Sequence, residues 1–207
     1  MMDIVIPSNN EKEFILLAEK LGYKTLCFLN NFDKYLGKKK FESKNVKISC
    51  GLIADSKNID RIKNILEKLC FSSELKDKVL IAIKSSENNR EIIEGSKANI
   101  IFSLEENNKR DFMHQRASGL NHILCRLAEQ NNVIIGFSLS SILDSKNKHI
   151  ILGRIMQNIK LCRKYKTKTV IASFASNPYE IKSPHDIISL FLALGMHPKE
   201  AKDSLNK

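Results

Sequence analysis

Residues 133–139 read Val-Ile-Ile-Gly-Phe-Ser-Leu, an almost unbroken apolar run of the length of one strand. Strands that are covered on both faces of a parallel sheet have this pattern, because none of their side chains faces water. Similar short runs rich in β-branched residues predict six further strands, at residues 3–6, 25–29, 46–54, 79–83, 99–102 and 169–173. The chain is therefore expected to build a sheet that lies beneath helices.

The segments between these runs have the 3.6-residue apolar period of helices. The first helix is expected to begin with a capping box at residues 8–11 and to end at Gly22, a residue that suits a left-handed helix end. Apolar stripes mark this helix and two others; they consist of Phe14, Leu17, Ala18 and Leu21, of Ala117, Leu120, Leu124 and Leu127, and of Leu152, Ile155, Ile159 and Cys162. On the last of these helices, Arg154 falls outside the stripe.

Two more helices are predicted near the C-terminus. Ser183, Pro184 and Asp186 occupy the N-cap, first and third positions that start a helix. This helix is expected to end at Gly195, and a short last helix is expected to begin at Pro198.

Strands that alternate with helices indicate a parallel α/β fold. A closed or nearly closed barrel and an open doubly wound sheet both fit the pattern, and the seven predicted strands are one fewer than a standard TIM barrel has. Because no stretch rich in Pro or Gly divides the chain, we expect residues 1–207 to form one domain.

The charge of the chain points to an anionic partner. The 207 residues include 34 Lys and Arg against 23 Asp and Glu, a net charge of +11. Such a field attracts polyanions, so nucleic acid is the favoured partner, although a basic surface without a partner is also compatible with the composition. The basic loop within residues 34–47 is open to both interpretations.

The cysteines and the apolar runs bear on location. The five cysteines are Cys27, Cys50, Cys70, Cys125 and Cys162; they form no CxxC pair, and most lie in apolar runs. This favours buried free thiols in a reducing cytoplasm over a disulfide framework or a zinc site. Residues 1–7 lack the pattern of a signal peptide, and the longest apolar stretch, near residues 187–194, is too short to span a membrane. We therefore expect a cytoplasmic protein without a membrane partner.

In βα barrels the functional residues follow the carboxyl ends of the strands. The segments at those positions are polar, rich in amides and basic, and they contain neither a His and carboxylate cluster nor a nucleophile or Gly-rich phosphate motif. Asp3 is interpreted as a structural acid near the barrel floor. No catalytic or metal-binding residue is therefore predicted. The candidate RNA-binding residues are Arg90, Lys109, Arg110, His114, Arg116 and Lys182.

Several segments resemble one protein family. Residues 116–128, with Gly119-Leu120-Asn121-His122, and the strand ending in Phe137-Ser138-Leu139 are similar to archaeal ribonuclease P protein component 3. The other matching segments lie at residues 2–7, 22–23, 172–176, 183–190, 194–196 and 201–202. The order and spacing of these segments extend the resemblance over nearly the whole chain.

The resemblance implies a TIM-barrel-like fold related to the polymerase and histidinol phosphatase barrels. It implies a subunit that supports the catalytic RNA in removing the 5′ leader from precursor tRNA. The implied partners are the ribonuclease P RNA, precursor tRNA, protein component 2 and the other protein subunits. Magnesium is expected for the RNA-catalysed reaction, and no cofactor is expected on this chain. The HxH metal motif of the phosphatase relatives is not carried over, because residues 4–7 read Ile-Val-Ile-Pro.

Two alternatives remain open at this point. One is a metal-dependent phosphoesterase of the same barrel superfamily, which predicts stoichiometric bound metal. The other is a small-molecule barrel enzyme, which predicts a pocket with perturbed acids. If the chain binds RNA, the scarcity of aromatic residues in the candidate loops predicts recognition of shape and phosphate.

Overall fold

A computed structural model describes residues 1–31, 41, 43–55, 80–95, 98–107 and 109–206. Its centre is a sheet of seven parallel strands whose spatial order is the order of the sequence. The strands are β1 (Met2–Val5), β2 (Thr25–Asn30), β3 (Lys47–Asp55), β4 (Leu80–Lys84), β5 (Ile100–Phe102), β6 (Ile134–Ser138) and β7 (Thr169–Ala172). All seven predicted strands are confirmed within one or two residues at each end, although Val79 lies outside the described residues.

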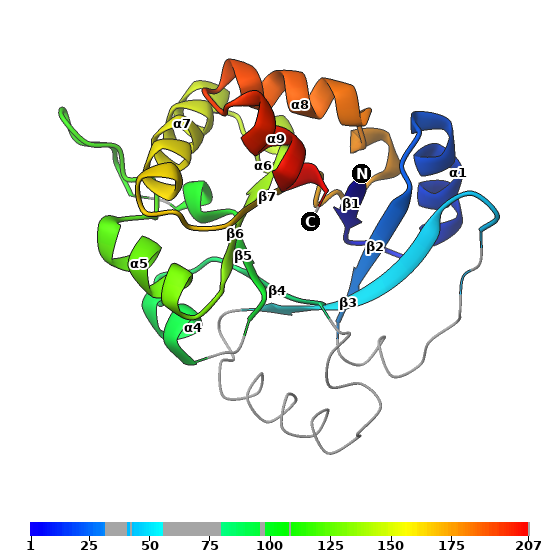
Figure 1. The fold of residues 1–207 in the computed structure, drawn as a ribbon, viewed down its shortest axis with the longest axis horizontal. Coiled ribbons are helices and arrows are strands. Elements are labelled where there is room, and N and C mark those ends of the chain that lie inside the picture. Colours follow the sequence, from blue (N-terminus) through cyan, green and yellow to red (C-terminus); the bar gives the residue numbers. More distant parts are fainter. Residues whose placement is uncertain (32–40, 42, 56–79, 96–97, 108, 207) are drawn as a thin grey trace.

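Helices surround the sheet (Figure 1). The described α-helices are α1 (Glu11–Leu21), α4 (Asn89–Gly95), α5 (His122–Gln130), α6 (Leu139–Asp144), α7 (Lys148–Lys164), α8 (Pro184–Ala193) and α9 (Pro198–Leu205). Short 3-10 turns, η2 (Leu104–Glu106) and η3 (Pro178–Glu180), follow β5 and β7. With strand 1 beside strand 7, the architecture is a nearly closed TIM-barrel-like fold and not an open sheet.

Backbone and side-chain contacts close the seam between β1 and the end of β7. The Phe174 amide donates to the Ile4 carbonyl, and the Ile6 amide donates to the Ala175 carbonyl, each at 2.8 Å. Asp3, which is fully buried, accepts bonds of 2.7 Å from both the amide and the hydroxyl of Ser173. The structural role predicted for Asp3 agrees with these contacts. Asp3 is the second residue of β1, and it contacts Ser173, which follows the carboxyl end of β7, across the seam.

The predicted helix ends are partly confirmed. Gly22 ends α1 at φ +80°, and the Ser183 side chain caps α8 by accepting from the Asp186 amide. The capping box at residues 8–11 is wrong: Asn10 is the N-cap, and its side chain accepts from the Ser8 amide instead of capping the helix. The stripe that began at Ala117 is also too long, because α5 starts only at His122.

The core consists mainly of Ile, Leu, Val and Phe on the strands and on the inner faces of the helices. Cys27, Cys125 and Cys162 are buried free thiols, as predicted, Cys50 is half-buried, and Cys70 lies outside the described residues. Among the described helices, none is both long and apolar enough to cross a membrane. Most of the basic loop at residues 34–47 also lies outside the described residues.

Candidate nucleic-acid interface

A polar network joins the carboxyl ends of three neighbouring strands. Lys84, the last residue of β4, pairs with Glu106 on η2, and Nζ lies 2.7 Å from Oε2. The Ser141 hydroxyl on α6 donates to the same carboxylate and lies 3.0 Å from the Ser103 hydroxyl. The Ser85 hydroxyl donates to the Ser103 carbonyl at 2.6 Å. These contacts fix η2 over the strand ends, which are the usual functional end of a βα barrel.

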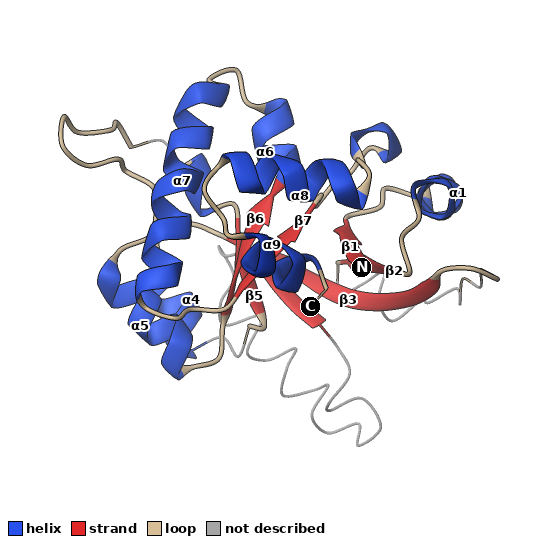
Figure 2. Ribbon diagram, turned by 45° about the horizontal axis from the view of Figure 1, so that its top comes forward, coloured by secondary structure: helices blue, strands red, loops and turns tan. Residues whose placement is uncertain are grey.

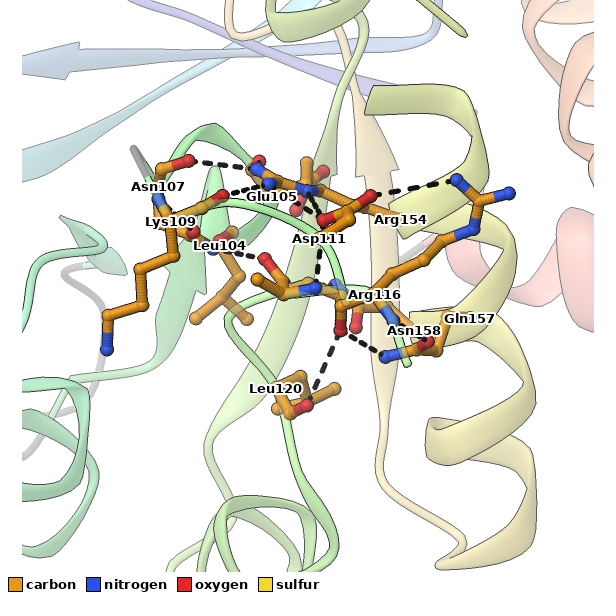
Figure 3. Close-up of polar contacts among 12 residues, drawn as sticks. Leu104, Glu105, Asn107, Lys109, Asp111, Arg116, Leu120, Arg154, Gln157 and Asn158 are labelled. Atoms are coloured by element: carbon orange, nitrogen blue, oxygen red, sulfur yellow. Dashed lines mark hydrogen bonds and ion pairs between the residues drawn. The ribbon is translucent and has the colours of Figure 1, made fainter. Parts of the chain in front are cut away.

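The loop that follows β5, residues 103–121, is held by one buried guanidinium. Arg154 on α7 has a side chain that is only 6% exposed. It donates to the carbonyls of Glu105 and Asn107 at 2.8 Å each and to the Lys109 carbonyl (Figure 3). Its Nε and Nη2 also bind Asp111 Oδ1 at 2.9 Å. A planar guanidinium with five donors suits this set of acceptors, so Arg154 sets the path of the loop.

Asp111 links the two halves of the loop. Its carboxylate accepts from the Ala117 amide at 2.9 Å and lies 3.7 Å from Arg116 Nη1. Desolvation raises the pKa of Asp111, but the hydrogen bond from the Ala117 amide and the contacts with Arg154 outweigh it. The pKa of Asp111 therefore lies below its ordinary value. The carboxylate therefore stays charged and keeps the loop closed over a wide range of pH.

The Gly119-Leu120-Asn121-His122 motif turns the chain from this loop into α5. Gly119 has φ +76°, and a Cβ there would lie 2.1 Å from the Leu104 carbonyl oxygen. Leu120 is buried, and the Asn121 side chain caps α5 by accepting from the Leu124 amide at 2.8 Å. The motif is thus explained by a left-handed turn, a core contact and a helix cap.

A cavity of about 870 Å³ opens between the ends of β4 and β5 and this loop. Three of the six candidate RNA-binding residues, Arg90, Lys109 and Arg116, lie on its wall together with Lys84. Arg110 and His114 belong to the same loop and are exposed, but they do not line the cavity. Lys182 follows η3, where its Nζ donates to the Tyr179 carbonyl at 3.3 Å, and it does not line the cavity either.

The four cationic side chains on the wall differ in whether they form ion pairs with carboxylates. Lys84 is paired with Glu106, and Arg90 lies 3.1 Å from Glu94 on an exposed face of α4. Arg116 is loosely paired with Asp111, and its guanidinium covers α7 at Gly153, where a Cβ would lie 2.4 Å from Nη1. Within the described part of the chain, the Lys109 ammonium has no ion-pair partner. An anion that enters the cavity would therefore meet Lys109 without first displacing a carboxylate.

A buried carboxyl lies behind the loop. Glu105 is fully buried, and its side-chain oxygens accept no hydrogen bond from another described residue. Burial raises its pKa to about 8, so the group is neutral at pH 7. The amide oxygen of Asn158, on α7, is likewise buried without a partner among the described residues.

Sequence reasoning missed the residues that shape this site. Arg154 was placed outside the apolar stripe of its helix, a position that predicts a solvated charge, yet it is buried. Asp111 lies in a segment that is polar throughout, so nothing in the sequence distinguishes it from its neighbours. Their pairing spans 43 positions, and no local pattern encodes which carbonyls the guanidinium meets.

The described residues contain no group of three or more His, Cys, Asp or Glu side chains that could hold a metal ion. The residues that line the cavity supply Lys and Arg side chains, the two carboxylates of Glu87 and Glu106, amides, hydroxyls, apolar side chains and an aromatic ring, that of Phe112. Such a surface can bind phosphate and sugar oxygens.

Fold and site together define a class of protein, a parallel TIM-barrel-like α/β protein with a basic, amide-rich cavity at the carboxyl ends of its strands. The whole chain, residues 1–207, matches the family described as RNase P subunit p30, and it belongs to that family. The resemblance found in the sequence is thereby confirmed, and the chain is a ribonuclease P subunit by family, in preference to a phosphoesterase.

Proteins named ribonuclease P protein component 3 are similar to this chain along most of its length. The protein of Methanosarcina mazei is 28% identical over 204 residues, covering 96% of this chain and 80% of the relative. The protein of Methanococcus vannielii is 30% identical over 174 residues, covering 82% of this chain and 71% of the relative.

Solved structures support the fold. A chain from a structure titled "cryo-EM structure of archaeal Ribonuclease P with mature tRNA" superposes with a TM-score of 0.73 at 22% identity, covering 98% of this chain and 85% of that one. An ochratoxinase from A. niger superposes with a TM-score of 0.61 at 7% identity, covering 99% of this chain and 69% of that one. At these identities the likeness concerns the barrel alone.

Proposed function

We propose that this chain serves as a protein subunit of ribonuclease P that supports the catalytic RNA in removing the 5′ leader from precursor tRNA. The observation that carries the proposal is the cavity at the carboxyl ends of β4 and β5, which gathers Lys84, Arg90, Lys109 and Arg116. Cations at this position lower the repulsion between RNA segments that must lie close together.

The chain's part in the reaction is to bind and position RNA. The RNA subunit performs the hydrolysis, and the magnesium that the reaction needs belongs to the RNA. The proposed partners are the ribonuclease P RNA, precursor tRNA, protein component 2 and the other protein subunits, in the cytoplasm. Arg90, Lys109, Arg110, His114, Arg116 and Lys182 stay the proposed RNA-binding residues, with those on the cavity wall foremost.

Reconstitution tests the proposal. The ribonuclease P RNA and its other protein subunits are assembled with and without this chain, and precursor tRNA cleavage is followed at moderate magnesium. We expect faster cleavage with the chain present, because the added cations reduce the magnesium that the RNA fold requires. A cleavage rate that does not change on adding the chain would contradict the proposal.

The control separates specific support from the effect of any basic protein. A variant with Lys160, Lys199 and Lys202 changed to Gln loses three exposed charges from α7 and α9, away from the cavity. It should stimulate cleavage as well as the unchanged chain does.

A further inference from the structure

We propose that the cavity beside β4 and β5 holds one unstacked nucleotide of a single-stranded RNA segment, with the Phe112 ring against the base and Lys109 and Arg90 against the flanking phosphates. This inference rests on the proposed function and goes beyond it by naming the kind of RNA that the site takes. Shape-and-phosphate binding, predicted from the sequence, would need no such cavity.

The size and the wall of the cavity suit a nucleotide. Its volume of about 870 Å³ falls within the range of roughly 300–1,000 Å³ that small-molecule sites have. Apolar side chains contribute part of the wall, among them Leu120, Ile123 and Leu124. Ser86, Gln115 and Asn121 place amides and a hydroxyl beside them. Base edges are recognised by such groups in single-stranded RNA, where they are not occupied by pairing.

Phe112 supplies the aromatic face. Phe112 is 74% exposed and is one of the residues that line the cavity, so its ring is accessible to a base that enters from solvent. The backbone that carries it is fixed, because the Phe112 amide donates to the Gln115 carbonyl at 2.8 Å and the neighbouring Asp111 is bound to Arg154. A ring on a pre-ordered turn can stack on a base at little entropic cost. The loop projects from the barrel beside α7 (Figure 2), where an RNA strand can reach it.

The charges around the ring favour RNA over a protein partner. Lys84, Arg90 and Arg116 on the wall are each paired with a carboxylate, whereas the Lys109 ammonium has no ion-pair partner among the described residues. Arg110 and His114 add basic groups on the same loop. An apolar protein side chain would gain nothing from this surplus of cations, whereas the phosphates on either side of a nucleotide would neutralise it.

The test compares two exposed aromatic residues in the full chain. Phe112→Leu removes the ring from the cavity, and Tyr179→Leu removes a ring that is 78% exposed on η3 and does not line it. The probes are a single-stranded oligouridylate and an RNA duplex of equal length, each titrated against the unchanged chain and both variants. We expect Phe112→Leu to weaken binding of the single strand about fivefold or more, the lower end of the effect of one stacked base. Duplex binding should not change, and Tyr179→Leu should behave as the unchanged chain.

Equal affinity of Phe112→Leu and the unchanged chain for the single strand would overturn the inference, and so would failure of the single strand to bind at all. Equal weakening for the single strand and the duplex would assign the ring to general docking and would also overturn it. The outcome is separate from that of the proposed function: if the unchanged chain and Phe112→Leu stimulate reconstituted cleavage equally and bind the single strand equally, the subunit role stands and the nucleotide site falls.

Discussion

Glu105 is a carboxyl group enclosed by protein, and its pKa of about 8 makes it a source of pH-dependent stability. The unfolded chain releases this proton near pH 4.5, whereas the folded chain keeps it until about pH 8. Stability from the neutral group is therefore complete below pH 4.5 and is lost as the pH rises towards 8, at about 1.4 kcal/mol per pH unit. Above pH 8 both states are ionised and the loss levels off.

Glu105→Gln should remove this dependence, because glutamine has the shape of the neutral acid and does not titrate. We expect the variant to be more stable than the unchanged chain at pH 8 and close to it at pH 4.5, as measured by urea unfolding. Asp3, whose pKa burial raises to about 6, should cause a similar slope in both proteins, but only between about pH 4 and pH 6, so its total effect on stability is smaller. An unchanged chain that is equally stable at pH 5 and pH 8 would contradict this account of Glu105.

For individual residues, the sequence predicted the exposed cationic residues of the candidate site better than the buried residues that position the loop. Arg90, Lys109 and Arg116 could be proposed because strands end just before the segments that carry them, and parallel strands end at one edge. The scarcity of aromatic residues in the loops gave no reason to single out Phe112, because its place on the cavity wall depends on how the loop folds. Burial of Arg154 could not be predicted, since it follows from carbonyls on a distant segment.

Among the elements, the turn into α5 explains why one helical stripe was misread. Ala117 and Leu120 have helical spacing to Leu124, yet Gly119 breaks the helix with a left-handed conformation. Leu120 still reaches the core, so the apolar pattern continues through a segment that is not helical. The strands were predicted more accurately, because a continuous apolar run bounded by polar residues marks where a buried strand begins and ends.

Gly119→Ala should destabilise the fold through two separable effects. A left-handed φ costs an alanine about 1–2 kcal/mol, and the Cβ would also overlap the Leu104 carbonyl. Gly22→Ala is the matched control, since Gly22 has φ +80° but nothing within 4 Å of its Cβ position. In chemical denaturation, Gly119→Ala should lose more stability than Gly22→Ala does. Equal losses would show that the loop moves away from Leu104 without cost.

Arg154→Met tests the loop after β5 as a unit. It leaves the Glu105, Asn107 and Lys109 carbonyls and the Asp111 carboxylate without their donor. Asp111 is 22% exposed and can be solvated, but the buried Glu105 carbonyl would lose its donor, which costs about 1–3 kcal/mol. We therefore expect a drop in stability of that order and faster proteolysis within residues 103–121.

Arg163→Met is the control on the same helix. Arg163 pairs with Glu200 at 2.6 Å, but its side chain is 35% exposed, and the loss should be smaller and should spare the loop. If Arg154→Met is cleaved in the loop no faster than Arg163→Met, Arg154 does not order the loop.

For the molecule as a whole, the net charge of +11 predicts that RNA association weakens steeply with salt. The location of the charge matters more than its total, because only cations that touch phosphate release counterions. Changing Arg90, Lys109 and Arg110 to Gln removes three exposed charges at or beside the cavity. Changing Lys160, Lys199 and Lys202 to Gln lowers the net charge by the same amount on α7 and α9.

The measurement is the slope of log K against log salt for binding of single-stranded RNA to the two triple variants and the unchanged chain. Each lost phosphate contact should lower the slope by about 0.7, so the variant at the cavity should lose about 2 from the slope if all three residues bind phosphate. The variant on α7 and α9 should keep the original slope, with a small uniform decrease in affinity from the lower net charge. Equal slopes for the two variants would mean that the field of the whole protein attracts RNA and that the cavity has no special part in binding it.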